Sequence, residues 1–250
     1  MPVRIKVIIP NSGMDRTILD SREQMLRQYV SPDCEISVDC IRSGPISIEA
    51  NSDEAVAEEA LISQAIEAEQ AGYQAVVVYC FSDLGVHALR ENLTIPVIGP
   101  GAVTIAAADM ISVRFTVITT AQKNVPRTAR RLQGSSVCRE KMAAVRAMNI
   151  PVEALRENPD VTREYLEAVC RKAVEIDGAD TVLLGCLGFA GYGAEIQEKL
   201  GITVLDPASL SVAYAETCAR NGIRHSRLAY PPYARRETFF SKGEGSVDGI

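Results

Sequence analysis

The chain has 250 residues, of which 47% are hydrophobic and 23% charged, and its formal net charge is −6. This is the composition of a globular protein with enough residues for one large α/β domain or two smaller ones. The negative charge and the lack of any Lys/Arg run argue against a nucleic-acid-binding surface. No apolar stretch reaches the roughly 20 residues that span a bilayer, and residues 1–10 lack the basic region and long apolar core of a signal peptide. We therefore expect a cytoplasmic protein with no nucleic-acid or membrane partner.

The first half of the chain alternates apolar, β-branched runs with helix-like stretches. Its expected elements, in chain order, are a strand over 3–10, a helix over 21–29, a strand over 35–41, a helix over 53–71, a strand over 74–80, a helix over 84–91 and a strand over 95–98. Continuous Val/Ile runs are typical of strands that are covered on both faces, as in a parallel sheet. Strands that alternate with helices predict βαβ units.

The second half repeats this pattern. Its expected elements are a strand over 115–120, a helix over 125–131, a weaker strand over 150–155, a helix over 162–176, a strand over 181–186, a helix over 194–200 and a strand over 202–205. Residues 72–80 align without gaps with residues 178–186, and residues 95–100 align with residues 202–207. A repeat of about 100 residues indicates two copies of one α/β unit rather than a solenoid. We expect a pseudo-twofold axis to relate the copies.

The chain contains seven cysteines and two histidines, and no two cysteines form a CxxC pair. An odd number of cysteines without such pairs makes a poor disulfide framework and a poor zinc site. Two histidines are too few for a His-rich metal centre. We therefore expect a reduced protein without a bound metal.

Two of the cysteines, Cys80 and Cys186, occupy equivalent positions in the two copies, and each ends the most apolar strand of its half. Ligands bind beyond the carboxyl ends of parallel strands, so a pseudo-twofold axis would place one thiol on each side of a bound molecule. A thiolate can then remove a proton from an acidic C–H while a thiol returns one to the opposite face, without a cofactor. Both residues also suit a small position in a core, but packing does not require the same residue in both copies.

Expected helices begin shortly after both cysteines, near Asp83 and Gly193. Their free N–H groups can lower the pKa of a thiol and hold an enolate oxygen. Asp83 is expected to cap the helix that follows it, with Ser82 as the other candidate for that position. The other five cysteines are interpreted as structural.

Residues 44–49 read Gly-Pro-Ile-Ser-Ile-Glu, and residues 80–83 read Cys-Phe-Ser-Asp and are followed by Leu84. These segments resemble the GPxSIE signature and, with Leu84 in place of the proline, the C-F-x-D-P motif of hydantoin and allantoin racemases, a branch of the aspartate/glutamate/hydantoin racemase superfamily. Three further segments match family segments, namely 98–100, 117–120 and 184–188. The second cysteine motif departs from the commoner G-C-[AT]-G-M at Leu187 and Phe189.

The resemblance implies an α/β protein of two flavodoxin-like parallel-sheet halves, with the active site in the cleft between them and a chain that crosses back at its end. The expected division is a first lobe of 1–105 with 210–230, a second lobe of 106–209 and a C-terminal tail of 231–250. The resemblance further implies that Cys80 and Cys186 are the two catalytic bases, that the substrate is a small molecule and that no cofactor takes part. We also expect a homo-oligomer.

The resemblance also suggests the residues of the substrate pocket, namely Asn11, Ser12, Ser47, Phe81, Ser82, Thr119, Thr120, Leu187 and Gly188. Each has a plainer interpretation, because Asn and Ser favour turns, Ser47 suits a cap and the threonines suit a strand end. Amino-acid racemases of the superfamily typically carry Asn-Thr after each cysteine, where this chain has Phe-Ser and Leu-Gly. Such a rim suits a neutral, flat, amide-bearing ring better than a zwitterion, so we favour a 5-substituted hydantoin or allantoin.

Other functions remain open. An amino-acid racemase and a cis–trans isomerase use two cysteines on the same scaffold, whereas a decarboxylase needs one, so the second thiol argues against it. A nucleotide-dependent oxidoreductase is a distant alternative, because residues 188–193 have their glycines in the order GxxGxG rather than GxGxxG. A non-catalytic two-lobed binding protein would not need paired cysteines at strand ends.

Overall fold

The computed structural model describes residues 2–150, 155 and 158–232. The first sheet in this part of the chain is formed by β1 (Arg4–Ile9), β2 (Glu35–Cys40), β3 (Ala75–Val78) and β4 (Val97–Ile98). The second is formed by β5 (Phe115–Thr119), β6 (Met142–Ala147), β7 (Thr181–Leu184) and β8 (Thr203–Leu205). Both sheets are parallel and have the same strand order, β2-β1-β3-β4 and β6-β5-β7-β8. The prediction of two parallel α/β halves is confirmed.

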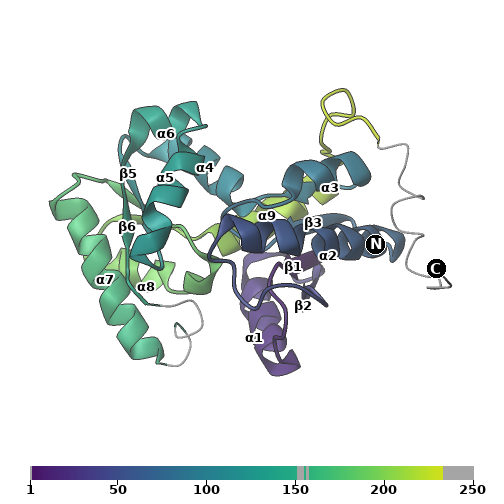
Figure 1. Cartoon of the computed structure of the whole chain (residues 1–250), viewed down its shortest axis with the longest axis horizontal. Coiled ribbons are helices and arrows are strands. Elements are labelled where there is room, and N and C mark those ends of the chain that lie inside the picture. The colour runs from purple at the N-terminus through teal and green to yellow at the C-terminus, as the bar shows by residue number, and fades with distance from the viewer. Residues whose placement is uncertain (1, 151–154, 156–157, 233–250) are drawn as a thin grey trace, which may run out of the picture.

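Helices cover both sheets. The first half carries α1 (Arg16–Leu26), α2 (Asn51–Gln70), α3 (Val86–Asn92) and α4 (Pro100–Ile111). The second carries α5 (Val125–Leu132), α6 (Ser136–Lys141), α7 (Pro159–Glu175), α8 (Gly193–Leu200) and α9 (Pro207–Asn221). Figure 1 shows β5, β6, α7 and α8 in the left half of the molecule and β1, β3, α2 and α3 in the right half, with α9 beside β3. The last helix thus follows the second sheet in sequence but packs on α4 and on β3 and β4 of the first.

The central strands are buried on both faces. Neighbouring residues on β3, Val77 and Val78, belong to different cores, and so do Leu183 and Leu184 on β7. Because successive side chains of a strand point to opposite faces, each sheet has one core on either side. The core that contains Val77 and Leu183 is shared by the two halves and includes Val212 of α9. This shared core fixes the carboxyl ends of β3 and β7 relative to each other.

One strand was not predicted. The strand beside β5 is β6, Met142–Ala147, whereas the strand expected over 150–155 falls mostly outside the described residues and stays a prediction. The sequence Met-Ala-Ala-Val-Arg-Ala has one β-branched residue and is only half-buried at the sheet edge, so it carries no clear strand pattern. Residues 151–154 lie outside the described part of the chain.

The division into two lobes and a tail stays a prediction, and most of the expected tail, from residue 233 onward, lies outside the described residues. Among the residues that the structure describes, no helix combines the length and apolar character needed to cross a membrane.

Candidate functional site

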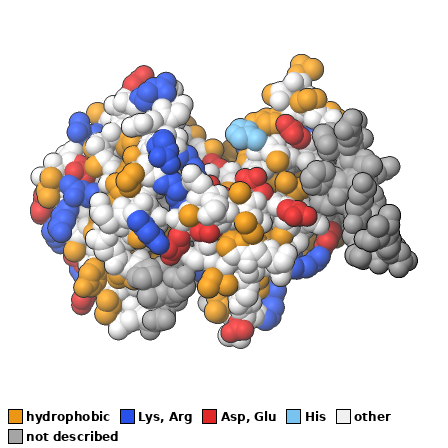
Figure 2. Space-filling view, in the orientation of Figure 1, with side chains coloured by type: hydrophobic (Ala, Val, Ile, Leu, Met, Phe, Trp, Pro, Cys, Tyr) orange, Lys and Arg blue, Asp and Glu red, His pale blue; other side chains and the backbone are white. Residues whose placement is uncertain are grey.

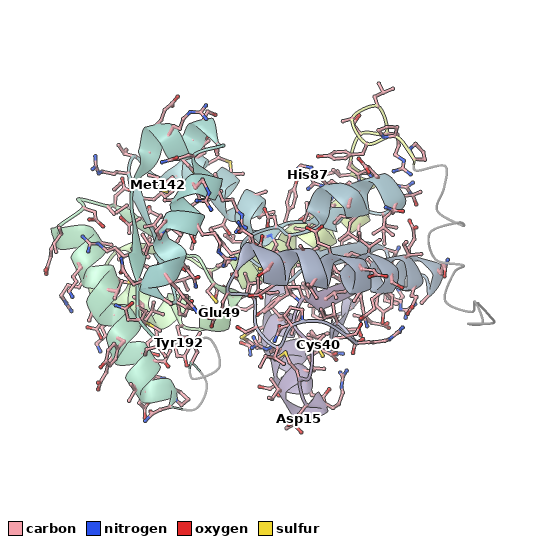
Figure 3. The ribbon with its side chains drawn as sticks, viewed as in Figure 1. Asp15, Cys40, Glu49, His87, Met142 and Tyr192 are labelled. Carbon is pink, nitrogen blue, oxygen red and sulfur yellow. The ribbon has the colours of Figure 1, made fainter. Side chains whose placement is uncertain are left out.

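A cavity of about 120 Å³ lies between the two halves, and both Cys80 and Cys186 contribute to its wall. Cys80 follows β3 and Cys186 follows β7, the two buried strands at the centres of their sheets. In Figure 2 the outline of the molecule is indented between the halves, and Figure 3 places Glu49, from the loop before α2, at this boundary. Lys123 of the second half forms an ion pair with Glu49. The two equivalent cysteines of the sequence repeat therefore line the same cavity.

Most of the residues suggested for the pocket line this cavity together with the cysteines, namely Asn11, Ser47, Phe81, Ser82, Thr119, Thr120, Leu187 and Gly188. Ser12 does not belong to the wall. Its hydroxyl donates to the carbonyl of Gly44 at 2.8 Å, and Asn11 Nδ2 donates to the carbonyl of Ile46 at 3.1 Å. Asn11 and Ser12 thus hold the loop that carries Ser47 against the end of β1.

Cys80 has a buried thiol next to a hydroxyl. Its Sγ lies 3.2 Å from Ser82 Oγ. Burial raises the pKa of Cys80, whereas hydrogen bonds from the Ser82 side chain and backbone act in the opposite direction. The thiol form is therefore favoured at Cys80 at neutral pH.

Cys186 accepts a backbone hydrogen bond in the equivalent position. The backbone N–H of Gly188 donates to Cys186 Sγ at 3.3 Å, and Cys186 stands at the start of the short 3₁₀ helix Leu187–Phe189. An N–H that points at sulfur stabilises the thiolate form. Both sulfurs thus accept a hydrogen bond from the backbone of the residue two positions on, and Cys80 has the Ser82 hydroxyl in addition.

Part of the wall of the cavity is charged, which the sequence did not indicate. Glu54, in the first turn of α2, accepts from Arg127 Nη1 at 3.2 Å and from Arg131 Nη2 at 2.6 Å, both on α5. Arg22 of α1 and Asn124 also line the cavity. On a helix such residues look like part of a solvated face, and the ion pairs between α2 and α5 bring Glu54, Arg127 and Arg131 together at the site.

Asp83 does not cap the helix that follows it. Helix α3 begins at Val86 with Gly85 at its N-cap, and the Asp83 carboxylate instead accepts from the backbone N–H groups of Gly101 at 2.8 Å and Ala102 at 2.7 Å. Asp83 therefore caps α4, because its backbone has φ of 55° and turns the side chain toward that helix. Ser82, the other candidate, contacts Cys80 instead.

In each half a carboxylate connects the loop after the cysteine to the start of a helix. In the first half the carboxylate, Asp83, belongs to the cysteine loop, and in the second half it belongs to the residue before the helix. Asp206, just before α9, accepts from the N–H of Gly191 at 2.8 Å, in the loop after Cys186, and from the N–H of Ala208 at 2.9 Å. In the repeat, Gly99 corresponds to Asp206. A Cβ atom at Gly99 would lie 2.6 Å from the Asp83 carboxyl carbon. A carboxylate thus joins each cysteine loop to the helix that follows the last strand of its half.

The Asp83 carboxyl should give the stability of the protein a pH dependence. Burial raises its pKa to about 6 from the ordinary value of 3.8, while the N–H groups of Gly101 and Ala102 act against this shift. The folded protein thus holds the proton more tightly than the unfolded chain. The stability that this proton contributes is complete below about pH 4 and is lost as the pH rises through about 6.

We expect the Asp83→Asn variant to lose this part of the pH dependence. The difference in unfolding free energy between wild type and variant, measured by urea titration, should change between about pH 4 and 6 and be flat from about pH 7 to 8. A difference that stays constant across the acid range would show that Asp83 does not titrate there.

Among the described residues, no group of three or more His, Cys, Asp or Glu side chains is arranged to hold a metal ion. The polar groups in the wall of the cavity are hydroxyls, backbone and side-chain amides, guanidinium groups and the carboxylate of Glu54. The arrangement can therefore move protons between sulfur and carbon and can donate hydrogen bonds to oxygen atoms of a small ligand.

The sequence model of the Asp/Glu/Hydantoin racemase family matches residues 5–215. A hydantoin racemase from Rhizobium meliloti is 32% identical over 232 residues, which cover 92% of this chain and 95% of that protein. The solved allantoin racemase from Klebsiella pneumoniae superposes with a TM-score of 0.84 at 30% identity and covers 92% of this chain and 94% of its own. The allantoin racemase from Pseudomonas fluorescens superposes with a TM-score of 0.85 at 26% identity, and the match covers 99% of this chain and 100% of that one. Since the match extends over most of its length, the chain belongs to the Asp/Glu/hydantoin racemase family.

Proposed function

We propose that this enzyme is a cofactor-independent racemase that inverts the C5 stereocentre of a hydantoin-type ring. The observation that carries the proposal is the presence of two cysteines from repeat-equivalent strand ends in the wall of one cavity. Hydantoin and allantoin racemases among the similar proteins support the ring as substrate.

The two sulfurs have complementary starting states in this proposal. The Cys186 thiolate, which accepts the Gly188 N–H, removes the C5 proton from one face of the ring. The electron pair left on C5 delocalises onto the neighbouring ring carbonyl as an enolate, and the Cys80 thiol delivers its proton to the opposite face. Cys186 ends as a thiol and Cys80 as a thiolate, and the same steps in reverse convert the other enantiomer.

The rest of the wall suits an uncharged ring with alternating carbonyl and N–H groups. Ser82 and Ser47 provide hydroxyls, Gly188 provides a backbone amide, and Phe81 and Leu187 provide apolar surface. Polar groups that converge on a small cavity fix the orientation of a ligand.

The test is to incubate single enantiomers of allantoin and of 5-isobutylhydantoin with the protein in deuterated buffer. We expect the optical signal, measured by circular dichroism, to decay to zero. Proton NMR should show deuterium replacing the proton on C5 over the same period. Buffer alone serves as the control for spontaneous exchange. Activity on aspartate or glutamate with none on either ring would favour the amino-acid racemase instead.

A further inference from the structure

Unsatisfied hydrogen-bonding groups are concentrated in the wall of the cavity. Five buried side-chain atoms there have no hydrogen-bond partner within the described residues, namely Arg22 Nε, Arg22 Nη1, Ser47 Oγ, Asn124 Oδ1 and Arg127 Nε. Buried polar atoms in folded proteins nearly always have a partner, and leaving one unmatched costs about 1–3 kcal/mol. The pattern therefore describes the hydrogen-bonding groups of a ligand.

Arg22 differs from the other arginines of the wall. Arg127 and Arg131 both pair with Glu54, whereas Arg22 forms no ion pair with any residue that the structure describes. Its guanidinium carbon lies 5.6 Å from the centre of the Tyr79 ring, next to Cys80. Arg22 also borders a recess formed with Gly191 in the loop after the other cysteine. Its free N–H groups thus belong to the region between the two cysteine loops.

The charges around the cavity leave one guanidinium unmatched. Three arginines and one glutamate line it. Glu54 balances one positive charge, and the catalytic thiolate balances a second. A neutral hydantoin ring brings no charge of its own. Ser47, Asn124 and Arg127 already offer the mixture of donors and acceptors that the edges of the ring require, whereas Arg22 adds donors alone.

We propose that Arg22 is a specificity-determining residue that donates from Nε and Nη1 to an oxygen acceptor at the end of the C5 substituent. This inference rests on the proposed function. A carboxylate satisfies the guanidinium best, because it supplies both paired acceptor oxygens and the missing negative charge. The carbonyl oxygen of a ureido group satisfies the same donors without the charge. An alkyl substituent leaves them unmatched.

The experiment compares three racemisation substrates: 5-carboxymethylhydantoin, allantoin and 5-isobutylhydantoin, the last having a branched alkyl group of similar shape in place of the carboxylate. The variants are Arg22→Met, which keeps the length of the side chain, and Arg22→Lys, which keeps the charge. Arg27→Met is the matched control, because Arg27 lies just after α1, is mostly exposed and, among the described residues, forms an ion pair only with Glu23, at 2.9 Å.

In Arg22→Met we expect kcat/KM for 5-carboxymethylhydantoin to fall by at least about tenfold, which corresponds to ~1.4 kcal/mol. The kcat/KM for 5-isobutylhydantoin should change by less than about threefold. Arg22→Lys should recover part of the loss, and Arg27→Met should change none of the ratios. A parallel loss for allantoin shows that Arg22 binds any acceptor oxygen, and no loss for allantoin shows that it selects charge.

Equal losses for all three substrates would overturn the inference, because Arg22 would then act on the ring or on folding rather than on the substituent. Unchanged kinetics in Arg22→Met would overturn it as well. If the wild-type protein racemises none of the three rings, the proposed function fails, and the inference fails with it. These results are distinguishable because the first two require an active wild-type enzyme.

Discussion

Cys80→Ser and Cys186→Ser are each expected to lower kcat/KM for racemisation by about 10²–10⁴-fold, the range typical of the loss of one acid–base group. A serine hydroxyl neither ionises to a base at neutral pH nor gives up its proton as readily as a thiol. Each variant thus retains a working group on one face of the ring only. Polarimetry on single enantiomers of the substrate measures the loss.

Deuterium exchange without inversion separates the roles of the two cysteines. In Cys80→Ser, the Cys186 thiolate can still remove a proton, exchange it with solvent and return deuterium to the same face. We expect one enantiomer to exchange while keeping its configuration. In Cys186→Ser, exchange of the other enantiomer should be slower at neutral pH, because burial raises the pKa of Cys80 and little of it is thiolate.

The matched control for both is Cys40→Ser. Cys40 is a half-buried free cysteine at the end of β2, outside the wall of the cavity, so its replacement should leave both racemisation and exchange unchanged. A loss of less than about tenfold in either Cys80→Ser or Cys186→Ser would contradict the two-base mechanism. Equal exchange of both enantiomers in one single variant would contradict the assignment of one sulfur to each face.

The parts of the fold that were predictable are those in which burial on both faces forces a continuous apolar sequence. The runs that became β3 and β7 are fully buried, and their spacing from the proline after β4 or β8, which differs by one residue between the halves, exposed the repeat. Strand β6 was missed because an edge position tolerates alanines and an arginine. The local sequence does not indicate that this segment pairs with β5, and that pairing is what makes it a strand.

The site divides in the same way. The cysteines stood out because the repeat placed one in each half, and residues near them in sequence followed from the resemblance. Arg22 and Glu54 lie on helices far from either cysteine in the chain, and a charged residue on a helix surface has no local pattern that distinguishes solvent from a shared cleft. Helix packing across the two halves decides their role, and one sequence alone does not contain that information in local form.

The Asp83 carboxylate, which joins the Cys80 loop to α4, is expected to contribute strongly to the stability of the protein. In Asp83→Gly the N–H groups of Gly101 and Ala102 lose their acceptor. Because each unmatched group costs about 1–3 kcal/mol, we expect the free energy of unfolding to fall by about 2–6 kcal/mol. Glycine tolerates the positive φ at position 83, so the loss reports the carboxylate rather than backbone strain. Activity should fall as well, since Cys80 lies three residues before Asp83 in the same loop.

The double variant Asp83→Gly with Gly99→Asp should recover most of that stability. It gives the first half the arrangement of the second, where Asp206 reaches back from the start of α9 to the N–H of Gly191, a glycine with φ of 92°. Gly99→Asp alone should be destabilising, because its Cβ would meet the Asp83 carboxyl group at 2.6 Å and two carboxylates would share one buried space. Wild type, the two single variants and the double variant form a double-mutant cycle, measured by urea titration and by kcat/KM. We expect a large favourable coupling between the two substitutions. Additive losses would mean that the two bridges are not equivalent and that each half holds its cysteine loop by different contacts.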